Sequence, residues 1–407
     1  MMLVRFCAWS LLFLTALAAA AEGADVAANR PDVRPVVPRG SERLATRPAV
    51  SAVAVLPQDG RSLYLDAFAA ARREIRIEIC VLEDPEVLTG LRAALERGVG
   101  VRVIVDRGKY DALEAERANL ETYLTSAGGE LHLSNPIFPR SFPKIILIDA
   151  ERVIYGSACL DQLSFAQYRD FAHLTDRREL VAEMARLFEN DWLYSAPVGA
   201  EAPLYNPTPP LSGTTDLLIS PVDASGRMVA LYQRARATLD VYTELLGNPT
   251  LESELAAAVA RGVRVRLITP LQVNGATPEE DAMHVASLEA LSSVGVDVHV
   301  SAAPETAERP YMHARAAVVD GSVAYLGSIS LSANGTTFNR EVGRIAPEPE
   351  VVEALRRQFE EDFTLRTRAL LTRRLPVAAR VAPGRPREAN PTRPSPSIRR
   401  SRCSCTR

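Results

Sequence analysis

The sequence is built from two similar halves, and this duplication restricts the fold more than any other feature. Residues 75–105 and 239–269 align without a gap at an offset of 164 positions, with Pro85 opposite Pro249. Each half predicts a strand, a helix and a second strand, because a helical apolar pattern ends at Arg-Gly and a β-branched run follows. Two such units in tandem indicate a layered α/β architecture.

The similarity continues beyond these units. Residues 128–134 pair with residues 295–301, and from Phe142 onward the offset settles at 171. Each half then ends in an amphipathic helix, ELVAEMARLFENDW in the first and EVVEALRRQFEEDF in the second. We therefore expect an α/β protein of two tandem repeats.

Each repeat contains a polar pattern with the same spacing. The two patterns are Phe142-x-Lys144-x4-Asp149-x6-Gly156-Ser157 and His313-x-Arg315-x4-Asp320-x6-Gly327-Ser328. Residues i and i+2 of a strand project to the same face, so His313 and Arg315 lie together. An imidazole, a cation and a hydroxyl on one face suit a phosphoryl group whose charge grows during attack.

The doubled spacing resembles the HxK(x4)D(x6)GSxN motif of the phospholipase D superfamily, and the duplication is similar to its two-repeat members, such as bacterial phospholipases D and cardiolipin synthases. The resemblance covers about residues 57–365. It implies that each repeat is a mostly buried mixed β-sheet flanked by helices, and that the two repeats pack as a pseudo-dimer. It implies hydrolysis or phosphatidyl transfer on phospholipid or other phosphodiester substrates, without a metal or other cofactor. In such a reaction one histidine attacks phosphorus, and the other protonates the leaving oxygen.

The resemblance also implies roles for particular residues in a cleft between the repeats. The implied catalytic set is His313, Arg315, Glu341, Lys144 and Asp320. Lys144 and Arg315 are expected to converge on one anion pocket. Glu341 stands 28 residues after His313, where the family has the acid that accepts the other ring N–H, whereas Asp170 stands 28 residues after Phe142.

The remaining motif positions are assigned to phosphate binding or to support. Ser328, Ser330 and Ser157 are the candidate phosphate-binding hydroxyls. Asp149 and Asp320 are expected to fasten the end of each motif strand rather than take part in the chemistry.

Three positions of the motif are altered, and four residues of this chain occupy them. Phe142 replaces a histidine and can neither attack phosphorus nor carry a proton. Arg315 replaces a lysine, and the motif asparagine is Cys159 in one copy and Ser330 in the other. Lys144 would be a substitute general acid only with a strongly lowered pKa. The main hypothesis is therefore a weakened phosphodiesterase of phospholipase D type, and the alternative is an inactive pseudoenzyme that binds phosphate-bearing headgroups.

A nuclease of the same superfamily is a second alternative, and the charge distribution argues against it. The net charge is -3, but residues 366–407 contain twelve Arg and one Glu, which leaves an acidic body. Phosphate contacts of nucleic acids need a basic surface on the folded part, so nucleic acid is not the expected partner.

The other histidines and cysteines show no ligand or framework spacing. His132 and His299 are expected to be structural or solvent-facing, and His173 and His284 to lie on the surface. The spacing of the five cysteines favours neither a disulfide framework nor a zinc site.

The ends of the chain differ from its body in composition. Residues 1–21 read as a secretory signal peptide, which implies a periplasmic or secreted protein. The expected order is then a Pro/Arg-rich linker at 22–56, repeat 1 at 57–195, a linker at 196–213, repeat 2 at 214–365 and a basic disordered tail at 366–407. The tail is expected to be solvated, with contact to an anionic membrane as the other interpretation.

Overall fold

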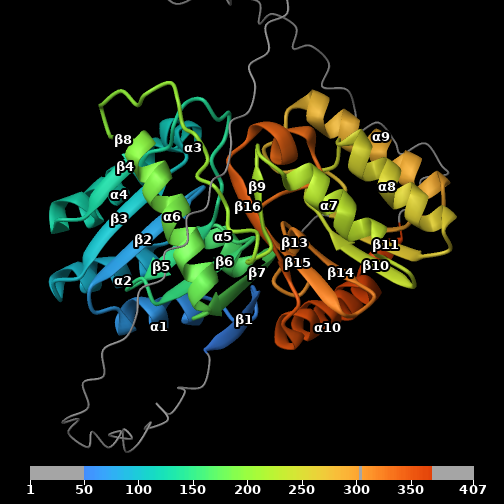
Figure 1. Cartoon of the computed structure of the whole chain (residues 1–407). Coiled ribbons are helices and arrows are strands. Elements are labelled where there is room, and N and C mark those ends of the chain that lie inside the picture. The colour runs from blue at the N-terminus through green and yellow to red at the C-terminus, as the bar shows by residue number, and fades with distance from the viewer. Residues whose placement is uncertain (1–49, 302–304, 369–407) are drawn as a thin grey trace, which may run out of the picture. The chain divides into compact units, whose positions relative to one another are not determined.

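The structure is a computed structural model that describes residues 50–301 and 305–368 (Figure 1). The predicted signal peptide, most of the first linker and most of the basic tail lie outside these residues. Among the described residues, no helix has both the length and the apolar character that a bilayer span requires.

A mixed sheet forms the centre of the first repeat. Its strands are β1 (Ser51–Leu56), β2 (Glu74–Ile79), β3 (Gly100–Val105), β4 (Glu130–Leu133), β5 (Ile145–Ile148), β6 (Arg152–Gly156), β7 (Tyr168–Thr175) and β8 (Ala196–Pro197). They are ordered β1-β7-β6-β5-β2-β3-β4-β8. Strands β2, β3 and β4 are parallel, and β5, β6 and β7 continue the sheet in alternating directions.

The second repeat rebuilds the same order. Its strands are β9 (Leu217–Ser220), β10 (Thr238–Tyr242), β11 (Arg264–Pro270), β12 (Asp297–Ser301), β13 (Tyr311–Met312), β14 (Ala316–Val319), β15 (Val323–Gly327), β16 (Glu341–Ala346) and β17 (Thr367–Arg368). The order β16-β15-β14-β10-β11-β12 repeats β7-β6-β5-β2-β3-β4 strand for strand. The prediction of two tandem repeats, each with a mixed sheet, is confirmed.

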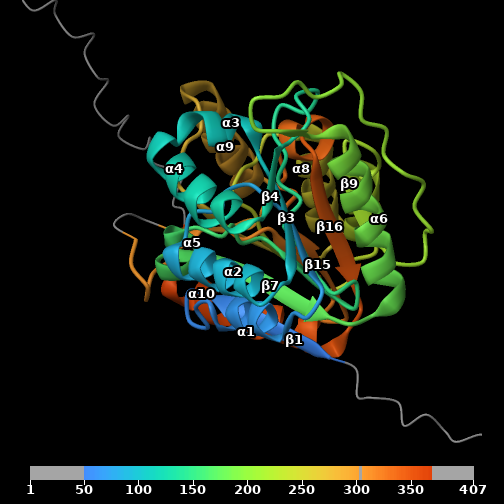
Figure 2. The same cartoon turned by 90° about the vertical axis from the view of Figure 1, so that its left-hand side faces the viewer.

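Helices cover the faces of both sheets. In chain order they are α1 (Ser62–Ala70), α2 (Pro85–Glu96), α3 (Arg107–Ala112), α4 (Glu114–Tyr123), α5 (Gln162–Ala166), α6 (Arg178–Tyr194), α7 (Ala224–Gln233), α8 (Pro249–Ala260), α9 (Pro278–Ser293) and α10 (Pro349–Leu365), with short turns η1 (Thr125–Ala127) and η2 (Asn334–Phe338). Helix α6 packs on β5 and β6, while α1 and α2 lie side by side (Figure 2). The predicted amphipathic helices are α6 and α10.

The ends of α2 and α8 show how similar sequences build similar elements. Asp84 and Asn248 accept hydrogen bonds from the first backbone N–H groups, and a proline follows each of them. Each helix ends at an arginine followed by Gly98 or Gly262, with φ angles of 86° and 87°. Only glycine reaches these angles without strain, which explains why Arg-Gly closes both helices.

Both predicted linkers contribute strands, so their boundaries were wrong. Strand β1 pairs along its whole length with β7, although residues 51–56 were assigned to the first linker. Strand β8 lies inside the predicted second linker and pairs with β4. Strand β17 lies at the start of the predicted basic tail and pairs with β12. Strands β8 and β17 have two residues each, too few for a period-2 pattern, and the six residues SAVAVL of β1 do not alternate between polar and apolar side chains.

The two repeats exchange reciprocal ion pairs. Arg169 of the first repeat binds both carboxylate oxygens of Asp362, at 2.7 and 3.0 Å, and Arg340 of the second binds both oxygens of Asp191 at 2.8 Å. All four side chains are buried, and each pair is related to the other by the offset of 171. A shared apolar cluster, which includes Phe188 from α6 and Phe359 from α10, surrounds the contact. The repeats therefore form the expected pseudo-dimer.

Candidate active site

The segment just before each motif strand pairs with residues of the other repeat. Met312 pairs with Arg169 in parallel register, and Ser141 pairs with Arg340 in the related position. The backbone N–H of Phe142 donates to the carbonyl of Arg340 at 2.7 Å. Because Arg169 and Arg340 directly precede the acids Asp170 and Glu341, this pairing moves each acid toward the motif of the opposite repeat.

His313 is consequently oriented by Asp170 and not by Glu341. The Nδ1 of His313 lies 2.8 and 2.9 Å from the two carboxylate oxygens of Asp170, 143 residues away in sequence. The expectation that Glu341 accepts this proton was wrong. It rested on a spacing of 28 residues within one repeat, whereas the segment before His313 pairs with a strand of the other repeat. Asp170 also accepts the hydroxyl proton of Ser157 at 2.6 Å.

Burial sets the protonation of this pair. The side chain of His313 is 11% exposed, and burial, with Arg315 beside it, holds the pKa of His313 well below its usual value. Burial raises the pKa of Asp170 to about 6, against the attraction of Lys144. The geometry therefore favours a neutral imidazole that donates from Nδ1 and leaves the Nε2 lone pair free to accept.

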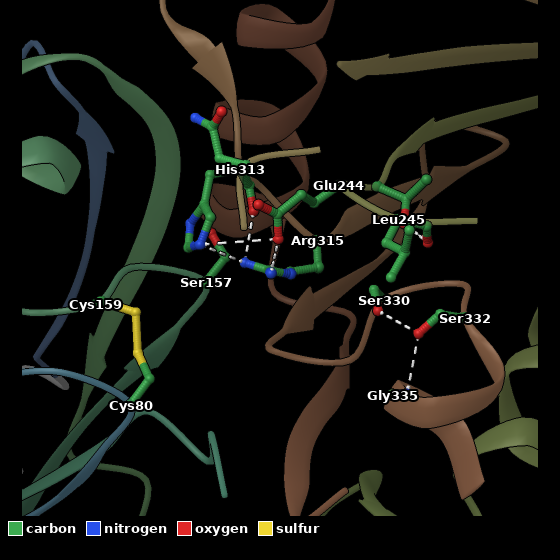
Figure 3. Close-up of polar contacts among 12 residues, drawn as sticks. Cys80, Ser157, Cys159, Glu244, Leu245, His313, Arg315, Ser330, Ser332 and Gly335 are labelled. Carbon is green, nitrogen blue, oxygen red and sulfur yellow. Dashed lines mark hydrogen bonds and ion pairs between the residues drawn. A yellow bond between two sulfur atoms is a disulfide. The ribbon is translucent and has the colours of Figure 1, made fainter. Parts of the chain in front are cut away.

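Arg315 occupies that lone pair. Its Nη1 lies 3.0 Å from Nε2 of His313 and 2.8 Å from the carbonyl of the same residue, as Figure 3 shows. Its Nη2 donates to the carboxylate of Glu244, the residue that follows β10 by two positions. Glu244 also accepts from the hydroxyl of Tyr311 at 3.0 Å. The only signal of Glu244 in the sequence is its charge next to apolar residues, which does not indicate a site.

Lys144 lies in the same electrostatic cluster. It is buried and donates to the carbonyl of Ser157. Burial and then the charge of Arg315 lower the pKa of Lys144 to about 7, and Asp170, Glu244 and Glu341 oppose that shift. The charges of Lys144 and Arg315, which come from different repeats, thus act on one another.

Glu341 is the repeat-related counterpart of Asp170. Its carboxylate accepts from the side-chain amide of Asn339 at 2.9 Å, and burial raises the pKa of Glu341 to about 7. The charge of Arg315 and the hydrogen bond from Asn339 limit this shift, while the hydroxyl of Ser328 donates to the carbonyl of Val342 at 3.3 Å. By the pairing described above, Glu341 is the acid that would serve an imidazole at position 142.

The motif aspartates lie at the ends of their strands. The carboxylate of Asp149 accepts from the backbone N–H groups of residues 72, 73 and 74, and that of Asp320 accepts from those of residues 236, 237 and 238. Both residues have positive φ angles, 56° and 50°. They anchor the turn that ends each motif strand to the start of β2 or β10, as expected.

The degenerate half-site contains a disulfide. Cys80 and Cys159 are bonded, with Cα atoms 6.0 Å apart (Figure 3). The expectation that the cysteines form no such framework was wrong for this pair, because the backbone segments that hold them run side by side only in the folded chain: Leu82 forms a bridge with Leu160. The partly buried side chain of Phe142 packs against the apolar cluster that contains both cysteines. Cys159 is therefore not free to act as a nucleophile.

On the other side of the site, the counterpart of Cys159 remains polar. The hydroxyl of Ser330 lies 3.0 Å from that of Ser332, which in turn accepts from the N–H of Gly335. Ser330 is buried but is held within this chain of hydroxyls, away from the bonds that Arg315 makes.

Two histidines expected on the surface are buried. His173 lies between Ser51 and Tyr155, and His284 between the N–H of Leu246 and the carbonyl of Pro270. His132 stacks on Trp192 and His299 on Phe363, which agrees with a structural role. Within the described ranges, no group of three or more His, Cys, Asp or Glu side chains is arranged to hold a metal ion.

Comparison with known proteins gives a consistent result. A profile of the family described as "Cardiolipin synthase, PLD-like domain" matches residues 64–192 and again residues 228–363. Cardiolipin synthase 2 of Bacillus anthracis is 23% identical over 333 residues, which cover 74% of this chain and 62% of that protein, less than two thirds of its length. The cardiolipin synthase of Geobacillus kaustophilus is 26% identical over 373 residues, covering 82% and 70%.

A solved structure shares the fold. The phosphatidylserine synthase of Haemophilus influenzae Rd KW20 superposes with a TM-score of 0.63 and 14% identity, covering 79% of this chain and 89% of that one. At this identity the likeness concerns the arrangement of strands and helices and not the chemistry.

Proposed function

The chain belongs to the family of cardiolipin synthase-type, phospholipase D-like proteins, and on that premise we propose that it is a phosphodiesterase of phospholipase D type with one working histidine. The substrate class is the phospholipid phosphodiester, cleaved by water or transferred to an alcohol. The observation that carries the proposal is His313, whose Nδ1 is held by Asp170 while its Nε2 faces the cation Arg315.

The first half-reaction assigns one task to each group. The Nε2 lone pair attacks phosphorus, the bond to the leaving oxygen breaks, and Asp170 stabilises the charged imidazole that forms. Arg315 binds nonbridging oxygens, where negative charge grows. Lys144, with a pKa of about 7, donates a proton to the leaving alkoxide in place of the missing histidine.

The second half-reaction reverses these roles. The neutral amine of Lys144 takes a proton from water or from an acceptor alcohol, whose oxygen attacks phosphorus while the phosphorus–nitrogen bond breaks. This returns His313 and Lys144 to their starting states. Because one proton carrier is buried and partly engaged with a carbonyl, we expect turnover to be slow.

The pseudoenzyme is the second candidate, and Phe142 favours it. A headgroup-binding protein would need the cations but not the proton carriers. Headgroup release from phosphatidylglycerol and phosphatidylcholine vesicles separates the two candidates. Slow turnover that disappears in His313→Ala, together with a phosphohistidine trapped by alkaline quench, supports the enzyme. Equal rates in wild type and His313→Ala would remove it. A DNA substrate in parallel tests the nuclease.

We also propose that the protein works in an oxidising compartment. The leader-like residues 1–21 support export, and the Cys80–Cys159 disulfide is of a kind that persists outside the reducing cytosol. Fractionation of cells that express the tagged full chain tests this: recovery in the cytosol with free thiols would contradict it.

A further inference from the structure

The guanidinium of Arg315 already holds an anion that belongs to the protein. Its Nη2 donates to Glu244, and the same carboxylate lies 3.9 Å from Nε2 of His313. A phosphate oxygen bound by Arg315 beside the attacking nitrogen would need this location. The carboxylate and the ligand therefore compete for one donor.

Arg315 also has an unused donor. Its Nε is buried and has no hydrogen-bond partner among the residues that the structure describes. A buried donor without a partner loses its hydrogen bond to water and gains none in return, so native structures rarely keep one. In this site it marks a place for an acceptor oxygen that the protein itself does not supply.

The charges of the site point the same way. The charge of Arg315 and the carboxylates of Asp170, Glu244 and Glu341 all act on Lys144. Asp170 is used by His313, and Glu341 takes a hydrogen bond from Asn339. Glu244 is the carboxylate that faces Arg315, and it is the one that a phosphate must displace.

Hydrogen bonds hold the segment that carries Glu244. Tyr311 donates to it at 3.0 Å, and the following segment is held by the bond from the N–H of Leu246 to His284 at 3.1 Å. At the offset of 164, the counterpart of Glu244 in the first repeat is Cys80, which is locked in the disulfide. The carboxylate is therefore a feature of the working half-site alone.

We propose that Glu244 is an internal anion that occupies Arg315 until a phosphate group displaces it. This inference rests on the phosphate site of the proposed function and adds a residue that sets its affinity. Displacement frees Nη2 and the unpartnered Nε to bind phosphate oxygens and withdraws Nη1 from the lone pair of His313. The site then becomes nucleophilic only when a phosphoryl group is present.

Titration of the full chain with inorganic phosphate, followed by calorimetry, tests the proposal. We expect Glu244→Gln, which removes the charge and keeps the shape, to bind phosphate at least about tenfold more tightly than wild type. Glu289→Gln is the matched control, because it removes the same charge from an exposed position on α9 and should leave the affinity unchanged. Unchanged or weaker binding by Glu244→Gln would overturn the proposal.

Tyr311→Phe supplies a second test with the opposite sign. The tyrosine hydroxyl is the partner that remains with Glu244 after displacement, so its loss should weaken phosphate binding about two- to fivefold. If Glu244→Gln does not fold, unchanged or tighter binding by Tyr311→Phe contradicts the proposal.

The vesicle assay separates this inference from the proposed function. Tighter phosphate binding by Glu244→Gln without turnover in any variant would leave the role of Glu244 standing and remove the enzyme. Turnover by wild type, with no gain in phosphate affinity in Glu244→Gln, would support the enzyme and overturn the role of Glu244. Absence of phosphate binding in all variants would overturn the role of Glu244.

Discussion

Asp170 of the first repeat accepts the Nδ1 proton of His313 of the second, at 2.8 Å, across the interface between the repeats. Asp170→Asn should lower kcat by about 10²–10⁴-fold, because the amide favours the wrong tautomer of the imidazole. Glu341→Gln serves as the comparison and should change kcat much less. A larger loss in Glu341→Gln than in Asp170→Asn would mean that the orienting acid lies in the same repeat as His313.

Replacing Phe142 should restore the second proton carrier. We expect Phe142→His to raise the rate of headgroup release by about 10²-fold or more, since general acid catalysis is worth that much. The gain depends on Glu341, which is retained without an imidazole to orient. The double variant Phe142→His/Glu341→Gln should lose most of it, and a gain that survives intact would argue against this pairing.

The reciprocal ion pairs should dominate the stability of the interface between the repeats. Asp362→Ala leaves Arg169 as a buried charge without its partner and should lower the free energy of unfolding by about 3–5 kcal/mol. Urea unfolding followed by circular dichroism measures this loss. Glu353→Ala breaks the exposed pair with Arg356 and should leave the urea midpoint unchanged. Similar midpoints for the two variants would contradict the assignment.

Reduction should destabilise the first repeat. The disulfide joins residues 79 positions apart, and closing a loop of that size stabilises a fold by about 4 kcal/mol in the chain-entropy account. Dithiothreitol should therefore lower the melting temperature of wild type. The Cys80→Ser/Cys159→Ser variant should melt at the lower temperature with or without reductant. A melting temperature of wild type that does not respond to full reduction would count against this role.

Histidine burial should make stability depend on pH. Burial lowers the pKa of His173 to about 4, below its value in the unfolded chain, so the unfolded state binds the extra proton first. The contribution of His173 is thus present above about pH 6.5 and is lost as the pH falls toward 4. The difference in unfolding free energy between wild type and His173→Gln should shrink over that window.

Glu341 provides the opposite sign as a control. Burial raises its pKa to about 7, so its contribution is present below about pH 4.5 and is lost as the pH rises through 7. Relative to wild type, Glu341→Gln should become more stable as the pH increases. The same pH trend in both variants would contradict the assigned directions.

Much of the fold can be predicted from the sequence, because each secondary-structure pattern occurs in both halves of the chain. The strand–helix–strand units, the Arg-Gly helix ends and the anchoring of Asp149 and Asp320 follow from spacing and local chemistry. The identity of the acid that binds His313 does not follow from the sequence. A spacing of 28 residues within one repeat cannot show that a strand of one repeat pairs with the other repeat. The register between Met312 and Arg169 exists only after the two halves dock.

The same limit explains the other errors. Cys80 and Cys159 share no spacing pattern, and their proximity depends on a bridge between segments far apart in the chain. Glu244 follows a strand as one charged residue among apolar neighbours, which alone indicates no partner. Asp362 aligns with Asp191 in the last helix of each repeat. The sequence does not show that the arginine partner of Asp362 belongs to the other repeat.

The pairing of β13 with β7 also determines what a fragment of the protein would contain. A fragment of residues 214–365 would contain the complete His313 motif and still lack the carboxylate that steadies its ring. The other fragment would supply that carboxylate and have no imidazole to use it. Cutting the chain between its halves therefore separates Asp170 from His313, and only reassembly of the two fragments would restore their hydrogen bond.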